Sequence, residues 1–173
     1  NTAMASVNAG VRHATHLFNA MTALAHRNPG VVGAALNSDV TTELIVDTFH
    51  VNPALYPILA KLKGDKLCFI TDCLPAGGLP EGQYTLGGTA FISKGIECRL
   101  LDGTIAGSIL KLNKGVWNVY TNSNIPLYEC VNCASLNPAN AIGIADRKGS
   151  LEKCKDFCHS ICDTILFHLF CNS

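Results

Sequence analysis

The sequence lacks an excess of charge of either sign, and charged residues are few. Thirteen lysine and arginine residues balance thirteen aspartate and glutamate residues, and charged residues make up 15% of the 173-residue chain. A basic patch that could hold a nucleic acid is missing, and so is an acidic tail typical of disorder. We therefore expect a folded domain whose partners do not include nucleic acid.

Long apolar runs are also missing. The longest fall well short of the roughly 20 residues that a helix needs to cross a bilayer. No charged segment followed by an apolar one stands at the start, so we expect neither a signal peptide nor a membrane anchor. The first residue is Asn1 rather than methionine, which we interpret as the mark of a fragment or a processed chain.

The sequence does have enough apolar material for a core, since 48% of its residues are hydrophobic. Three apolar segments are predicted strands: His13 to Phe18, Glu43 to Val51 and Lys66 to Asp72. The connections between them are each about long enough for one helix. This alternation predicts an α/β fold built on a parallel sheet.

The best-defined helix is predicted over residues 53–63. Asn52 can cap it, Pro53 occupies its first turn, and Gly64 ends it. The residues expected to form its buried stripe are Leu55, Ile58, Leu59 and Leu62. A strand–helix–strand unit is therefore expected between the second and third predicted strands.

Each predicted strand carries a polar side chain near its end. His16 lies in the first, Asp72 ends the third, and His50 lies in the second with Asp47 as a partner that can orient it. The carboxyl ends of strands carry the chemistry in parallel α/β proteins. The ordinary alternatives are a histidine that is hydrogen-bonded in the core and an aspartate that caps a turn.

Two further segments can contact a ligand. Arg27 lies in a turn beside Pro29 and Gly30, where a fixed cation suits a phosphate, although a solvated surface arginine is an equal alternative. Residues 106–108 are predicted to begin a helix over the apolar positions 109, 112, 116 and 119. Their amides can bind a ligand or simply be capped.

Nine cysteines is a high count, and an odd number fits a reducing cytosol better than a disulfide framework. We expect Cys68 and Cys73, at the ends of the third strand, to serve as small buried hydrophobic residues. Cys130 and Cys133 form a CxxC motif but share a helical face with Leu127, which favours core packing over metal or redox chemistry.

After the third strand the pattern changes. Residues 84–100 contain short strands separated by glycines and predict a β-hairpin excursion. Helices are predicted again around 127–134 and 138–142, and residues 149–152 resemble the start of another strand. We therefore divide the chain into residues 1–143 and a final segment, residues 144–173.

Six motifs resemble, in order, those of the N-acetylglucosamine-6-phosphate deacetylases, a family of the amidohydrolase superfamily. They are THLFNAM at 15–21, HRxPG at 26–30, DxxH at 47–50, TD at 71–72, AGS at 106–108 and ASLNPA at 134–139. The resemblance extends over residues 1–153, and the tail after Asp156 departs from the pattern.

The resemblance implies the C-terminal part of a (β/α)8 TIM-like barrel with a remnant of a small β-sandwich domain. Residues 1–143 would hold the last barrel strands, and residues 144–173 would return towards the small domain. The implied enzyme is a cytoplasmic homodimer that hydrolyses the N-acetyl group of N-acetylglucosamine 6-phosphate, giving glucosamine 6-phosphate and acetate. Its implied cofactor is a divalent metal ion, zinc first, with iron, manganese or cobalt as alternatives.

By position in these motifs, Asp72 matches the catalytic aspartate and His16 a metal-ligating histidine. The residues that match substrate contacts are Asn19, Ala20, His26, Arg27, His50, Ile105, Ala106, Gly107 and Ser108. In the family, the element matching His26 and Arg27 reaches the site of the neighbouring subunit. The family's other two metal ligands, a glutamate and a histidine on earlier strands, have no counterpart here, so we expect the chain alone to be inactive.

Two alternatives remain open. The substrate can be a related amino-sugar phosphate, such as the galactosamine analogue. The chain can instead be a non-catalytic fragment whose cysteine-rich tail, with Cys154, Cys158 and Cys162, stores metal or contacts another subunit.

Overall fold

Three parallel strands lie at the centre of the structure, a computed structural model that describes residues 2–156. They are β1 (His13–Ala14), β2 (Thr41–Ile45) and β3 (Leu67–Ile70), paired in that order. Both pairs are parallel, with His13 opposite Thr41 and Ile45 opposite Ile70. The prediction of three strands in a parallel sheet is confirmed, although each strand is shorter than expected and ends before its polar residues.

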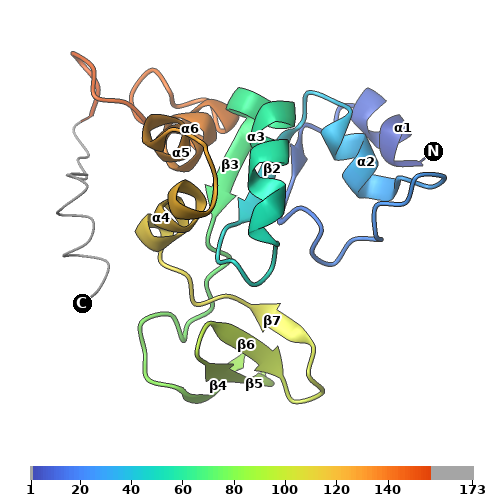
Figure 1. Ribbon diagram of the computed structural model, residues 1–173, viewed down its shortest axis with the longest axis vertical. Helices are drawn as coiled ribbons and strands as arrows, with labels where there is room; N and C mark the ends of the chain where they lie inside the picture. Colours follow the sequence, from blue (N-terminus) through green and yellow to red (C-terminus); the bar gives the residue numbers. More distant parts are fainter. Residues whose placement is uncertain (1, 157–173) are drawn as a thin grey trace.

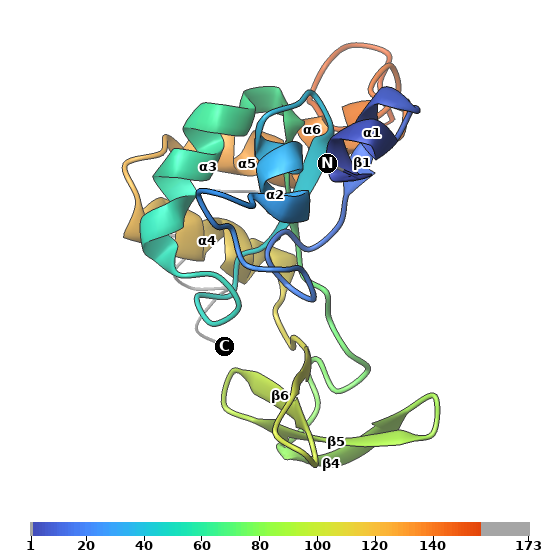
Figure 2. The ribbon, with the colours of Figure 1, turned by 90° about the vertical axis from the view of Figure 1, so that its right-hand side faces the viewer.

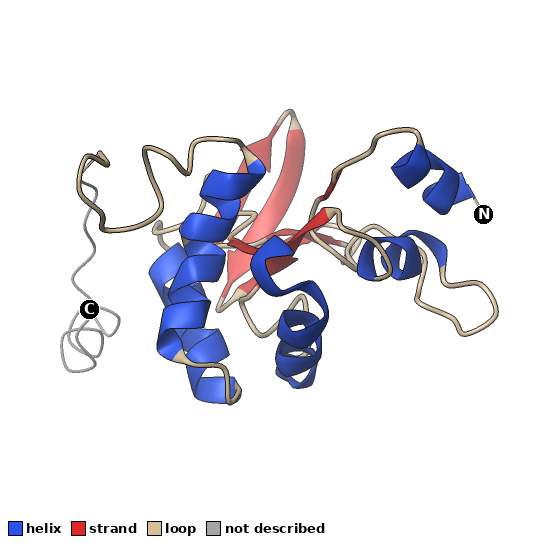
Figure 3. Ribbon diagram, turned by 90° about the horizontal axis from the view of Figure 1, so that it is seen from above, coloured by secondary structure: helices blue, strands red, loops and turns tan. Residues whose placement is uncertain are grey.

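Helices connect and cover these strands (Figures 1 and 3). They are α1 (Thr2–Asn8), α2 (Gly30–Leu36), α3 (Tyr56–Lys63), α4 (Leu112–Asn122), α5 (Leu127–Ala134) and α6 (Leu136–Ala141), with short 3₁₀ turns η1 (Pro53–Leu55) and η2 (Gly64–Lys66). Because α2 lies between β1 and β2 in the sequence and α3 between β2 and β3, the first 70 residues contain two successive strand–helix–strand units.

The predicted helix after β2 is confirmed, but its buried stripe was wrong in part. The Asn52 side chain accepts a hydrogen bond from the Ala54 N–H at 3.0 Å, as a cap should. Ile58 and Leu62, however, are 54% and 55% exposed, whereas Tyr56 is buried. The first turn, η1, is a 3₁₀ turn with three residues per turn, which changes the face that the following residues present.

One hydrophobic core joins the parallel strands to the helices around them. Its buried members include Leu44 and Val46 on one strand segment, Leu67 and Phe69 on β3, and residues of α3, α4 and α5. Cys130 and Cys133 lie in this core, which confirms the prediction that they pack rather than act as an exposed CxxC pair. Cys68 is buried as expected, but Cys73 is exposed, because the chain has left the sheet by that point.

A second, antiparallel sheet lies between β3 and α4 in the sequence. Its strands are β4 (Gly82–Leu86), β5 (Thr89–Lys94), β6 (Glu97–Leu100) and β7 (Ile105–Gly107), paired in that order. Figures 1 and 2 show it below the helices and the parallel strands. Its own small core contains Leu74, Ala76, Phe91 and Cys98. The predicted hairpin over 84–100 is thus the centre of a four-stranded sheet that extends to residue 107.

The segment after α6 has no regular structure in its described part. Residues 144–156 form turns and bends, and the strand expected at residues 149–152 is absent from this part. The tail, including Cys158 and Cys162, lies outside the described residues, so the division at residue 143 stays a prediction. Within residues 2–156, no helix is long and apolar enough to cross a membrane.

Candidate active site

The three predicted site segments follow the carboxyl ends of β1, β2 and β3. His16 comes just after β1, Asp47 and His50 come after β2, and Asp72 comes after β3. Because the strands are parallel and adjacent, these ends lie at the same edge of the sheet. The structure therefore brings the three polar tips to one side of the molecule, as the sequence predicts.

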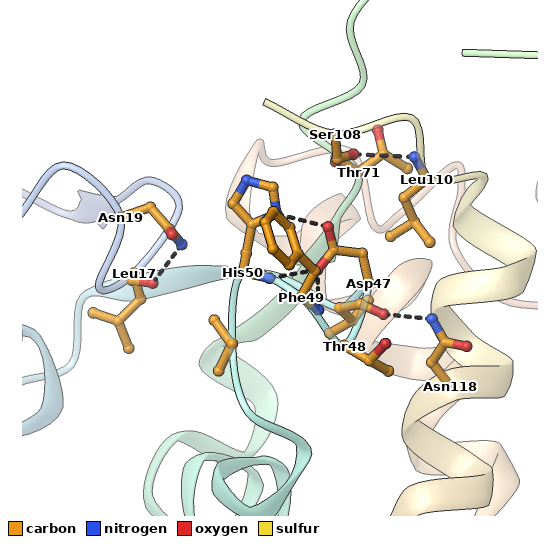
Figure 4. Close-up of polar contacts among 12 residues, drawn as sticks. Leu17, Asn19, Asp47, Thr48, Phe49, His50, Thr71, Ser108, Leu110 and Asn118 are labelled. Atoms are coloured by element: carbon orange, nitrogen blue, oxygen red, sulfur yellow. Dashed lines mark hydrogen bonds and ion pairs between the residues drawn. The ribbon is translucent and has the colours of Figure 1, made fainter. Parts of the chain in front are cut away.

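The turn after β1 has an unusual backbone. His16, Phe18 and Ala20 have positive φ angles of 32°, 76° and 53°. Residues other than glycine rarely adopt positive φ angles, and those that do are concentrated at functional sites. This backbone also explains why β1 ends at Ala14 rather than at Phe18. The Asn19 amide donates to the Leu17 carbonyl at 3.2 Å, which folds the turn onto itself (Figure 4).

The His16 ring holds a buried nitrogen without a partner. Its Nδ1 is the single buried side-chain nitrogen or oxygen atom, among the described residues, that has no hydrogen-bond partner. Burying a polar atom in this way is costly, and such an atom needs an explanation, of which an absent ion is one. A metal ion fits this observation. His16 is a single ligand, however, and residues 2–156 contain no group of three or more metal-ligating side chains.

Asp47 and His50 form a buried pair after β2. The Nδ1 atom of His50 lies 2.6 Å from Oδ2 of Asp47, and the two side chains are 3% and 4% exposed. The other carboxylate oxygen accepts from the N–H groups of Phe49 and His50 at 2.9 and 2.8 Å (Figure 4). The prediction that Asp47 orients His50 is confirmed, since the bond fixes the ring and its tautomer.

The environment of Asp47 favours its charged form. Burial raises the pKa of the Asp47 carboxyl, but hydrogen bonds from the His50 ring and from the Phe49 and His50 amides outweigh that effect and leave the pKa below its usual value. Asp47 is therefore ionised at neutral pH. It orients the His50 ring as a charged acceptor.

Several residues that support this pair could not be predicted from the sequence. The Asn118 side chain of α4 donates to the Val46 carbonyl at 3.0 Å (Figure 4), and the Tyr56 hydroxyl accepts from the Thr48 N–H at 3.2 Å. Burial raises the pKa of Tyr56 to about 12, so the hydroxyl stays protonated. The Asn118 contact joins segments 72 residues apart and leaves no local pattern, and the Tyr56 contact spans a loop of eight residues whose fold is not evident from the sequence.

The small sheet reaches the same region. The Arg99 guanidinium of β6 lies over the Phe49 ring, 5.2 Å from its centroid, and Phe49 packs edge-on against the His50 ring at 5.5 Å. A pocket of about 320 Å³ beside this contact is lined by Asp47, Thr48, Ile96, Ile109, Leu110, Lys111, Lys114 and Asn118. The antiparallel sheet and α4 thus form walls next to the buried pair.

Asp72 follows β3 in a conformation set by its backbone. Its φ is 48°, and its carbonyl accepts from the Ser108 N–H at 3.0 Å, while the Ser108 carbonyl accepts from the Leu74 N–H at 2.8 Å. The Ser108 hydroxyl donates to the Thr71 carbonyl (Figure 4). The Asp72 side chain itself is exposed. Its carboxylate has no hydrogen bond or ion pair within residues 2–156.

The segment 105–108 is not the start of a helix, which corrects the prediction. Ile105, Ala106 and Gly107 form β7, Ser108 continues beside Cys73, and α4 begins only at Leu112. Pairing with β6 on one side and with the Asp72 loop on the other keeps this segment extended. It therefore lies next to Asp72 through its backbone and not through helical amides.

Gly107 allows this close approach. Its φ is 143°, and a Cβ atom there would lie 3.0 Å from Leu74 Cγ and 3.2 Å from the Asp72 carbonyl oxygen. We expect Gly107→Ala to lower the free energy of unfolding by about 1–3 kcal/mol. Gly103→Ala is the control: its φ is 90°, and no atom lies within 4 Å of an added Cβ, so its loss of stability measures the backbone strain alone. Urea unfolding of both variants checks this, and equal losses would contradict a role for the close approach.

His26 and Arg27 lie elsewhere. They form the tip of a turn closed by the Asn28 N–H donating to the Ala25 carbonyl at 3.1 Å, and both are exposed. Arg27 borders a pocket that it shares with Thr2 and Ala3 of α1. Neither the turn's contacts nor this pocket includes His50 or Asp72. The structure thus brings together the tips of β1, β2 and β3, but it does not bring His26 and Arg27 to them.

Comparison with known proteins gives consistent matches. The N-acetylglucosamine-6-phosphate deacetylase of Bacillus subtilis (strain 168) is 43% identical over 164 residues, which cover 91% of this chain and 41% of that protein. The N-acetylgalactosamine-6-phosphate deacetylase of Escherichia coli O157:H7 is 36% identical over 149 residues, which cover 86% of this chain and 40% of that protein. A crystal structure of N-acetylglucosamine-6-phosphate deacetylase from Pasteurella multocida matches with a TM-score of 0.85 and 36% identity. The match covers 88% of this chain and 41% of that one.

The chain spans about two fifths of the length of these relatives. The model of the Amidohydrolase family matches residues 2–172. This match continues past Asp156, where the motif resemblance to the deacetylases ends. A family model that matches almost the whole chain shows that the chain belongs to the amidohydrolase family.

Proposed function

We propose that the protein carrying this chain hydrolyses the N-acetyl group of N-acetylglucosamine 6-phosphate, giving glucosamine 6-phosphate and acetate. The observation that carries the proposal is the buried, unpartnered Nδ1 of His16 at the same sheet edge as the unpaired carboxylate of Asp72. In this proposal β1, β2 and β3 are the last strands of a (β/α)8 barrel, and a remnant of a β-sandwich domain follows. The protein acts in the cytoplasm.

His16 is the residue of this chain that would hold a divalent metal ion, with zinc as the first candidate. When bound, such an ion polarises the acetamide carbonyl and lowers the pKa of water. Asp72 takes a proton from the attacking water and gives it to the departing amine nitrogen, for which its exposed carboxylate is free. The bond from the Ser108 N–H to the Asp72 carbonyl holds the backbone that carries this carboxylate, and Gly107 passes close beside it.

The remaining residues hold the sugar phosphate. His50, fixed by Asp47, contacts the sugar, and segment 105–108 lies over it next to Asp72. Asn19 and Ala20 contact the phosphate from the turn after β1. Binding energy from this phosphate positions the distant amide for attack. His26 and Arg27, exposed at the tip of their turn, reach the phosphate in the partner site of a homodimer.

Acetate release by the full-length protein tests the proposal. We expect turnover of N-acetylglucosamine 6-phosphate in the presence of a divalent metal, and a much lower kcat/KM for N-acetylglucosamine, which lacks the phosphate. N-acetylgalactosamine 6-phosphate is the second substrate to assay, because a relative that acts on it matches this chain nearly as well. Absence of acetate release from both phosphates would overturn the proposal.

A further inference from the structure

Glu43 connects β2 to β1 through three hydrogen-bonding contacts. One carboxylate oxygen, Oε1, lies 2.9 Å from Nε2 of His13, and the other, Oε2, accepts from the Thr15 hydroxyl at 2.7 Å. The Glu43 carbonyl accepts from the Leu17 N–H at 2.8 Å. The Glu43 side chain is 24% exposed, whereas the His13 side chain is 43% exposed and Thr15 is exposed, so its two side-chain bonds lie at the surface of the sheet edge.

The contacts of Glu43 fall on both sides of His16. The sheet pairing of β1 stops at Ala14, so the ladder itself does not hold the residues that follow. His16 adopts φ 32°, a conformation that persists only where its surroundings fix it. The bonds from Thr15 and Leu17 to Glu43 hold the chain immediately before and after His16, and the His16 carbonyl accepts from the Asn19 N–H at 2.9 Å.

The position of the His16 ring follows from this backbone. In the proposed function, Nδ1 of His16, which is buried and has no partner within the described residues, is the nitrogen that would bind the metal. Groups that orient a metal-ligating side chain tune how strongly the metal is bound. The bonds that hold the chain on either side of His16 therefore help to decide where Nδ1 lies.

We propose that Thr15 and Glu43 are positioning residues for His16, and that the bond between the Thr15 hydroxyl and the Glu43 carboxylate sets the strength of metal binding. The inference rests on the proposed role of His16 as a metal ligand. Removing a group that orients a ligand typically weakens metal binding about 10- to 100-fold. The effect here reaches His16 through its backbone.

The test is Thr15→Val in the full-length protein, which removes the hydroxyl but keeps the shape. Thr41→Val is the matched control: Thr41 lies on β2 opposite His13, and within residues 2–156 its hydroxyl makes no hydrogen bond. Zinc dissociation constants are measured by competition with a chelator, and Tm is measured on the same samples without metal. We expect Thr15→Val to bind zinc about 10-fold more weakly, with a Tm close to that of Thr41→Val.

Two further variants distinguish a loss of His16 positioning from a general loss of stability. Thr15→Ser keeps the hydroxyl and is expected to restore zinc binding. Glu43→Asp keeps the charge but shortens the side chain, so it is expected to weaken binding in the same direction as Thr15→Val. Equal zinc affinity in Thr15→Val and Thr41→Val would overturn the inference.

The outcome for His16→Ala distinguishes this inference from the proposed function. If His16→Ala leaves zinc binding unchanged, the proposed metal role fails and the inference fails with it. If His16→Ala loses zinc while Thr15→Val does not, the inference alone is overturned.

Discussion

Asp72→Asn in the full-length protein is expected to lower kcat for acetate release by about 10²- to 10⁴-fold. The amide has the shape of the carboxylate but cannot take a proton from water. Because the substitution changes none of the residues proposed to contact the sugar, KM is expected to change far less than kcat. Steady-state acetate release, with metal content measured on the same preparation, checks both expectations.

The fold is expected to tolerate this substitution. The Asp72 side chain is exposed, and the residue is held through its carbonyl, which accepts from the Ser108 N–H. Asp146→Asn is a matched control, since Asp146 is exposed and its carboxylate has no hydrogen bond or ion pair in the described part of the chain. An Asp72→Asn protein with kcat within a few fold of Asp146→Asn would exclude Asp72 as the proton-transfer group.

Asp47→Ala is expected to have the largest effect on stability. It removes a buried carboxylate that binds the His50 ring and two backbone N–H groups, and it leaves these donors without a partner. Removing one member of a buried pair typically costs about 3–5 kcal/mol. Urea unfolding at neutral pH measures the loss, and Asp146→Ala serves as the exposed control. A loss no larger than that of the control would contradict the role of the pair.

The stabilising effect of Asp47 also has a predicted pH dependence. The pKa of its carboxyl is lower in the folded protein than its ordinary value of 3.8, so the folded state favours the ionised form. Its contribution is therefore fully present above that value and is lost as pH falls through the folded pKa. The difference in unfolding free energy between wild type and Asp47→Ala is expected to stay constant near neutral pH and to shrink in acid.

The parts of the fold that depend on local pattern were predictable. Apolar periodicity and the cap at Asn52 gave the three strands and α3, and their parallel order placed His16 and Asp72 at one sheet edge. The pairing of Asp47 with His50 was also predictable, because the two residues are close in sequence.

Contacts between distant segments could not be predicted. Ser108 lies beside Cys73 only because the whole antiparallel sheet folds back to its starting point, and the segment 106–108 read alone resembles a helix start. Similarly, Arg99 meets Phe49, and Asn118 meets Val46, through tertiary packing that leaves no trace in either local sequence.

The bridge between Cys73 and Ser108 has a consequence for how this architecture can vary. Residues 74–107 extend away from the parallel strands after Cys73, and the chain returns to them at Ser108. The two ends of this segment therefore lie side by side. Insertions with adjacent ends are tolerated well, because their length does not alter the host scaffold. Evolution can therefore remodel the wall beside Phe49 without moving β3, which precedes Asp72.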